Sequence, residues 1–321
     1  MSEQPRPRRG APDPAPSFGP AGTPPGLPPP APGVSDPQQR YDVRGLPAAS
    51  PVKGGRVSFP GVLKAEWIKL WSLPSTWWVL AATVLVTVGV GALLGASLGL
   101  LADSPGIDVG QVSGELTFRA TDAAASGVFG QLVLSILAVL FVTGEYSSGQ
   151  IRSTFTAVPG RISVLVAKTC IIAVVSGVVT LFASYGAVVA GWTLMPAGAI
   201  DDRFTLEGLR LIGGMALATA LIALFALAVA FLVRSTAGGV GIVVAVLFIL
   251  PMVLSLLSWD WVPRLHRYLL DMSQAGLYQP PSASMLTVGG GLDFLTALGV
   301  TAAWAFVPLG LAAVLLRRRD A

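Results

Sequence analysis

Six long apolar runs dominate the pattern of hydrophobic and polar positions along the chain. They cover residues 77–101, 126–142, 163–190, 209–233, 240–257 and 295–316. Each is close to the roughly 20 residues that a helix needs to cross the hydrocarbon core of a bilayer. The composition agrees, because only 12% of the residues are charged, whereas a soluble domain carries about 25%. The sequence therefore predicts an all-α polytopic membrane protein with six transmembrane helices.

The charges that flank these runs predict an orientation. One side holds the basic residues Lys64, Lys69, Arg152, Arg161, Arg234 and Arg317 to Arg319, and the other side holds acidic residues of 103–122 and 201–207. Loops rich in Lys and Arg stay in the cytoplasm. Both termini are therefore expected to be cytoplasmic. No helix carries a basic stripe interleaved with aromatic residues, so nucleic acid is not expected as a partner.

A polar loop at residues 144–162 separates the second and third runs. Its candidate functional residues are Glu145, Ser147, Ser148, Gly149, Arg152 and Arg161. Glu145 stands at the end of a span, where it is expected to accept hydrogen bonds from the loop backbone and to fix its shape. Gly149 allows a turn that other residues resist, and the arginines can pair with carboxylates or anionic lipid. The alternative for Glu145 is a simple helix-end cap.

A short amphipathic segment, residues 61–71, precedes the first run. Leu63, Trp67, Leu70 and Trp71 share one helical face, Lys69 lies with Glu66 on another, and Lys64 lies at the border. This layout predicts a helix in the headgroup plane, with tryptophans at the boundary and lysines toward lipid phosphates. The alternative is an ordinary juxtamembrane stub.

Within the first run, Gly91, Gly95 and Gly99 recur at every fourth position. Such spacing makes a smooth helix face that another helix can approach closely. A helix–helix contact is expected there, either within the chain or between two copies. The alternative is glycine merely tolerated in a membrane helix.

The remaining segments carry less information. Residues 1–58 form a Pro-, Gly- and Arg-rich tail, expected to be disordered and cytoplasmic, ahead of a membrane domain at 59–321. Residues 258–291 are too polar to span, and short interfacial helices are expected between 263 and 278 on the outer side. His266 is interpreted as an interfacial side chain there rather than as a catalytic base.

Motifs for chemistry are sparse. The chain has one Cys and one His, so neither an internal disulfide nor a Cys/His zinc site is expected, and no other metal site is predicted. No Walker sequence occurs, and no HExxH. Lys168 is the ionisable residue deepest in a predicted span, and its amine is expected to reach back to the cytoplasmic interface. The energy for any transport must therefore come from outside the chain.

The order of these features resembles the permease subunit of ATP-binding-cassette (ABC) exporters of the second type, in the form common in high-GC Gram-positive bacteria. The matching residues are the amphipathic segment 63–70, the Glu145–Gly149 stretch, Arg152, Arg161 and the basic C-terminus. Glu145 and Gly149 match the coupling motif of the family, whereas Gln150 stands where Thr is more usual.

The resemblance implies a mechanism and partners. The loop 144–162 would form a coupling helix docked on a separate ATPase subunit, which would hold the ATP and magnesium, so this chain would need no cofactor and have no enzymatic activity. The segment 63–71 would be the interface helix. Two permeases, identical or homologous, would pair in the bacterial plasma membrane. Two alternatives stay open: a non-transporting membrane scaffold or sensor that recruits partners through its proline-rich tail, and, less favoured, an intramembrane enzyme.

Overall fold

The computed structural model describes residues 58–102, 120–157, 160–194, 205–257, 259, 261–279 and 291–318. Apart from Ser58, the tail that was predicted to be disordered lies outside these residues. The described helices are α1 (Phe59–Ser72), α2 (Pro74–Ala102), α4 (Ala120–Ser147), α5 (Gln150–Ala157), α6 (Arg161–Thr193), α7 (Leu206–Val233), α8 (Thr236–Val244), η2 (Ala245–Ile249), α9 (Leu250–Ser255), α10 (Val262–His266), α11 (Leu270–Tyr278) and α12 (Phe294–Arg318).

Six helical stretches of the described chain are long and apolar enough to cross a membrane. They are α2, α4, α6, α7, the continuous α8–η2–α9 stretch and α12. Each overlaps one predicted run, so the prediction of an all-α membrane protein with six spans is confirmed. Most of the helices extend past the predicted limits, because backbone hydrogen bonding continues where the sequence turns polar.

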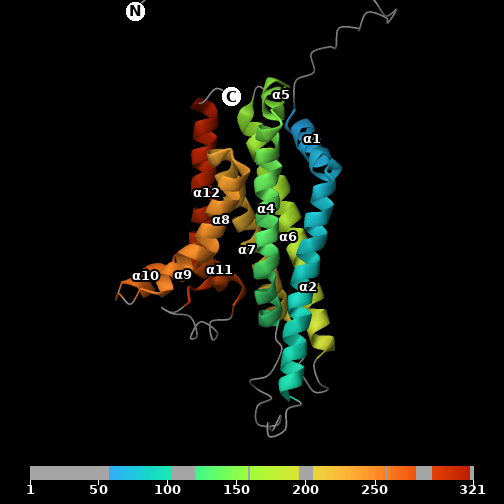
Figure 1. Cartoon of the computed structure of the whole chain (residues 1–321), viewed down its shortest axis with the longest axis vertical. Coiled ribbons are helices and arrows are strands. Elements are labelled where there is room, and N and C mark those ends of the chain that lie inside the picture. The colour runs from blue at the N-terminus through green and yellow to red at the C-terminus, as the bar shows by residue number, and fades with distance from the viewer. Residues whose placement is uncertain are drawn as a thin grey trace, which may run out of the picture. The chain divides into compact units, whose positions relative to one another are not determined.

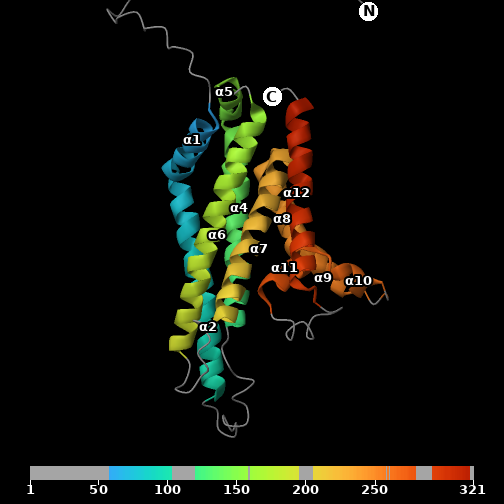
Figure 2. The same cartoon turned by 180° about the vertical axis from the view of Figure 1, so that it is seen from behind.

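The core is built around α7, which packs against α4, α6, α11 and α12. In its most apolar stretch 78% of the residues are buried, compared with 22% in the α8–η2–α9 stretch and in α12. A helix that is apolar on all sides belongs in such a central place. In both views α1, α5 and the C-terminal end of α12 lie at the same end of the bundle (Figures 1 and 2).

Helices α2 and α6 approach closely through small residues. A Cβ atom added at Gly91 would lie 2.6 Å from the Cβ of Ala187, and one added at Gly95 would lie 2.5 Å from the Cα of Gly191. Gly99, one turn farther along, is also buried. For Gly91 and Gly95 the structure thus shows a contact within the chain.

A matched pair of substitutions in α2 tests this packing. Gly95→Ala is expected to lower the free energy of unfolding by about 1–3 kcal/mol, because the added methyl group overpacks against the α6 backbone. Gly89→Ala is the control: its Cβ would meet nothing within 4 Å, so its effect is expected to be neutral or slightly stabilising. Unfolding in mixed detergent micelles measures both. Equal stabilities of the two variants would show that the α2–α6 contact is looser than described.

The region between the fifth and sixth spans forms short helices, as predicted. They are α10 and α11, and α11 packs against α7 and α12. His266 at the end of α10 is buried, and its place at the membrane interface stays a prediction. Helix α10 packs against α9 and projects sideways from the bundle (Figures 1 and 2).

Candidate functional site: a buried ring of four charges

Four charged side chains from three helices meet near the end of the bundle that holds α1 and α5. Glu66 and Lys69 come from α1, Glu145 comes from the last turn of α4, and Lys168 comes from the second turn of α6. We call these four residues the charged ring. Two ammonium groups and two carboxylates give it a net charge of zero.

Each lysine of the charged ring contacts both glutamates. The Nζ atom of Lys168 lies 2.6 Å from Oε2 of Glu66 and 2.7 Å from Oε1 of Glu145. The Nζ atom of Lys69 lies 2.7 Å from the same Oε1 of Glu145 and 3.0 Å from Oε1 of Glu66. Charges of opposite sign therefore alternate around a closed circuit, and the ring connects α1, α4 and α6.

The charged ring is shielded from solvent on most sides. The exposed fraction is 0% for Lys168, 2% for Glu66 and 4% for Glu145. Lys168 also donates a hydrogen bond of 3.4 Å to the carbonyl of Phe141, and its Nζ lies 3.8 Å from the centre of the Phe141 ring. Burying an ion costs several kcal/mol unless it is paired. The four charges are thus tolerated only together.

Lys69 is the solvent-facing member, with 22% of its side chain exposed. Partial burial alone would lower the pKa of its ammonium group. The hydrogen bond and the negative charge of Glu145, together with Glu66, outweigh this effect, so the pKa of Lys69 is raised above its ordinary value. Lys69 is therefore charged throughout the physiological pH range.

The local sequence explains how the ring forms. Val62, Glu66 and Leu70 are spaced by four residues and form the buried stripe of α1. Phe141 and Glu145 have the same spacing on α4, so the aromatic ring and the carboxylate face one side. The first turns of α6 then bring Lys168 between these two stripes.

The ring lies next to the corner that leads into α5. Glu145 is followed by Ser147, the last residue of α4, and only Ser148 and Gly149 separate α4 from α5. Gly149 adopts a positive φ of 71°, which a glycine adopts without strain. The hydroxyl of Ser148 donates to the carbonyl of Gly144 at 2.8 Å and closes the corner. A short, hydrogen-bonded connection therefore links α5 to the end of α4 that carries Glu145.

The coupling residues predicted from sequence fall into three groups. Ser147, Ser148 and Gly149 are exposed at the corner. The guanidinium of Arg161 donates to the carbonyl of Leu316 on α12 at 3.4 Å. The side chain of Arg152 lies outside the described part of the structure.

The expected role of Glu145 needs a correction. Its carboxylate was predicted to accept hydrogen bonds from the loop backbone, but Lys69 and Lys168 are the donors. Because Glu145 is buried, its carboxylate cannot touch a soluble partner in this conformation.

The expected direction of Lys69 on the interface helix was wrong, whereas the position of its tryptophans at the membrane boundary stays a prediction. Trp67 is 41% exposed, Leu63 and Trp71 are half-buried, and the buried stripe instead contains Glu66. Lys69 points to the ring rather than to lipid phosphates, because two carboxylates lie within its reach. Lys64 remains exposed on the outer side of α1.

Sequence reasoning missed Glu66 and misjudged Lys168. Lys168 does not reach the interface by extending its side chain; it is fully buried and paired. A signal existed for both. Glu66 stands midway between two apolar residues at helical spacing, and an intramembrane lysine demands a nearby carboxylate.

Other chemistry finds little support in the described residues. Gly95, Ser97 and Gly99 have the spacing of a nucleophile elbow, but they lie inside α2, whereas that motif needs a strand, a sharp turn and a helix. The Ser97 hydroxyl donates to the carbonyl of Leu94 in the same helix. No group of His, Cys, Asp and Glu in the described part could hold a metal ion.

Together, six apolar helices and a charged ring at one end define the class of the chain: an all-α, multi-pass membrane protein. No protein-family model matches the chain, and no curated protein matches it in sequence.

Proposed function

We propose that the chain is the permease subunit of an ABC exporter in the bacterial plasma membrane, driven by a separate ATPase subunit that docks on α5. The observation that carries this proposal is the charged ring. It connects the helix that precedes the first span, the end of the second span and the start of the third span, directly beside an exposed helical corner.

The shape of α5 supports a docking role. Ile151 is buried and anchors the helix, while Gln150, Ser153 and Thr156 are exposed. A polar face on a helix anchored in this way suits contact with a soluble protein. The corner at Gly149 transmits force because it is short and hydrogen-bonded.

The charges of the ring support a mechanical role. Both lysines are paired with both glutamates, so the ring forms a rigid connection between three helices. When the docked ATPase moves α5, the ring makes α1, α4 and α6 move together. The substrate would pass between two such bundles, from two identical or two homologous permeases.

Co-purification tests the proposal. The tagged chain, extracted from its native membrane, is expected to bring down a Walker-motif ATPase that mass spectrometry identifies. Ser153→Trp on the exposed face of α5 is expected to lose the ATPase. Thr193→Trp, at the exposed far end of α6, is the control and is expected to keep it.

Two results would contradict the proposal. Absence of an ATPase from the wild-type complex would favour a scaffold or sensor. Retention of the ATPase by Ser153→Trp would place its docking site away from α5.

A further inference from the structure

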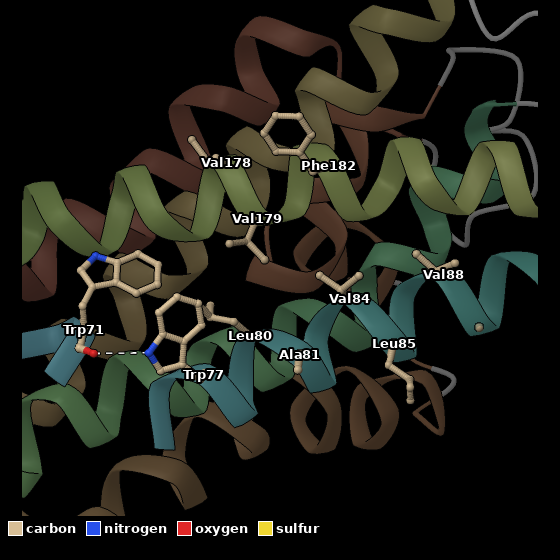
Figure 3. A pocket seen from close by; sticks show the side chains of 11 residues that line it. Trp71, Trp77, Leu80, Ala81, Val84, Leu85, Val88, Val178, Val179 and Phe182 are labelled. Atoms are coloured by element: carbon tan, nitrogen blue, oxygen red, sulfur yellow. Dashed lines mark hydrogen bonds between the residues drawn. The ribbon is translucent and has the colours of Figure 1, made fainter. Parts of the chain in front are cut away.

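One face of α6 borders a groove on the outside of the bundle. Cys170, Val174, Val178 and Phe182 are spaced by four residues and share this face. With α1, the first two line a hollow of about 330 Å³. With α2, the last two line a second hollow of about 830 Å³ (Figure 3). We call the two hollows together the α6 groove.

Three tryptophans, whose rings are tilted against one another, line the α6 groove where its two parts adjoin. The ring centres of Trp67 and Trp71 are 5.5 Å apart, and those of Trp71 and Trp77 are 4.9 Å apart. The indole N–H of Trp77 donates to the carbonyl of Trp71 at 3.3 Å (Figure 3). Trp67 borders the first part, and Trp71 and Trp77 border the second. Tryptophan is the residue typical of the headgroup level of a bilayer.

The length of the α6 groove corresponds to one leaflet. From Cys170 to Phe182 the helix rises about 18 Å, at 1.5 Å per residue. Half of the roughly 30 Å hydrocarbon core is about 15 Å. A transmembrane helix of a second copy would run through both leaflets. An acyl chain of a lipid in the leaflet on the α1 side matches the groove better.

The α1 end of the groove carries a positive charge. Lys64 lines this end and is exposed, and no described residue forms an ion pair with it. The rest of the lining named above is apolar or aromatic. Lys69, five residues farther along α1, is engaged in the charged ring with Glu66 and Glu145. Lys64 is thus placed to meet a phosphate at the headgroup level.

We propose that the α6 groove binds one anionic phospholipid from the leaflet on the α1 side. Its phosphate lies at Lys64, and one acyl chain runs along Val174, Val178 and Phe182. The bound lipid holds α1 against α6, beside the charged ring. An effect of the bound lipid on coupling to an ATPase rests on the proposed function, whereas the binding of the lipid to the groove does not.

Native mass spectrometry of the purified full chain in detergent tests the binding, with phosphatidylglycerol and phosphatidylcholine as probes. The wild type is expected to retain one phosphatidylglycerol in preference to phosphatidylcholine. Lys64→Gln should bind phosphatidylglycerol about fivefold more weakly, the effect of one lysine near an anionic headgroup. Val174→Trp should block the acyl chain and abolish retention. The controls Arg317→Gln and Leu311→Trp, both exposed on α12, should bind as the wild type does.

A second readout locates the lipid. Cys170 is the only cysteine of the chain and is exposed. Its alkylation by N-ethylmaleimide is expected to slow when phosphatidylglycerol is added and not when phosphatidylcholine is added.

Three outcomes would overturn the proposal: equal retention of the two lipids, wild-type retention by Lys64→Gln and Val174→Trp, or a lipid-free dimer that Val174→Trp dissociates. The last would assign the groove to a second copy. Because the chain is measured without an ATPase, these outcomes are independent of the co-purification result.

Discussion

Replacing Lys168 by Met is expected to lower the free energy of unfolding by about 3–5 kcal/mol, the usual cost of removing one partner from a buried ion pair. The substitution keeps most of the side-chain volume but leaves Glu66 and Glu145 close together with only Lys69 between them. Unfolding of the purified chain in mixed micelles measures the loss.

A double variant separates charge from packing. Adding Glu66→Gln to Lys168→Met leaves one lysine and one glutamate in the ring, so part of the lost stability is expected to return. Arg317→Met, at an exposed position, should change stability by no more than about 0.5 kcal/mol. A Lys168→Met variant as stable as the wild type would mean that the ring does not hold the three helices.

Under the proposed function, Glu145→Gln is expected to uncouple ATP hydrolysis by the partner ATPase from movement of the spans. The amide keeps the size of the side chain but loses its charge, and Glu145 accepts bonds from both lysines. A hydrogen bond to a charged group contributes about 1.5–3 kcal/mol. Loss of such a bond should therefore reduce, by at least about tenfold, the change that ATP makes in the equilibrium constant between the two conformations of the spans.

The readout is the distance between nitroxides attached at Ser153→Cys on α5 and Ser97→Cys on α2, in the Cys170→Ser chain reconstituted with the proposed partner ATPase. ATP should change this distance in the chain with an intact charged ring. In Glu145→Gln the distance should stay nearly constant, while ATP is still hydrolysed. Glu207→Gln, an exposed carboxylate at the start of α7, is the control. A full response in Glu145→Gln would show that force reaches the spans by another route.

The sequence was sufficient for the spans because their signal is local. A run of about 20 apolar residues predicts a membrane helix without knowledge of its neighbours, and all six were found. The corner at Gly149 could also be predicted from the sequence, since glycine after a helix end favours a turn. The π-helical segment η2 (Ala245–Ile249) was not, because its sequence is as apolar as an ordinary α-helix.

The charged ring could not be predicted in detail because its contacts are distant in sequence. Lys168 meets Glu66 across 102 positions, and Lys69 meets Glu145 across 76. Helical spacing alone suggested that Glu66 and Lys69 form the polar face of α1. This face of α1 becomes the buried one only because α4 and α6 bring Glu145 and Lys168 to it, so that the four charges neutralise one another.

The most direct test of the account is the side of the membrane on which α5 lies. Ser153→Cys in the Cys170→Ser chain places a single reactive thiol on its exposed face. A membrane-impermeant maleimide is expected to label it only after the cells are opened. Labelling in intact cells would contradict the account, because a cytoplasmic ATPase could then not reach α5.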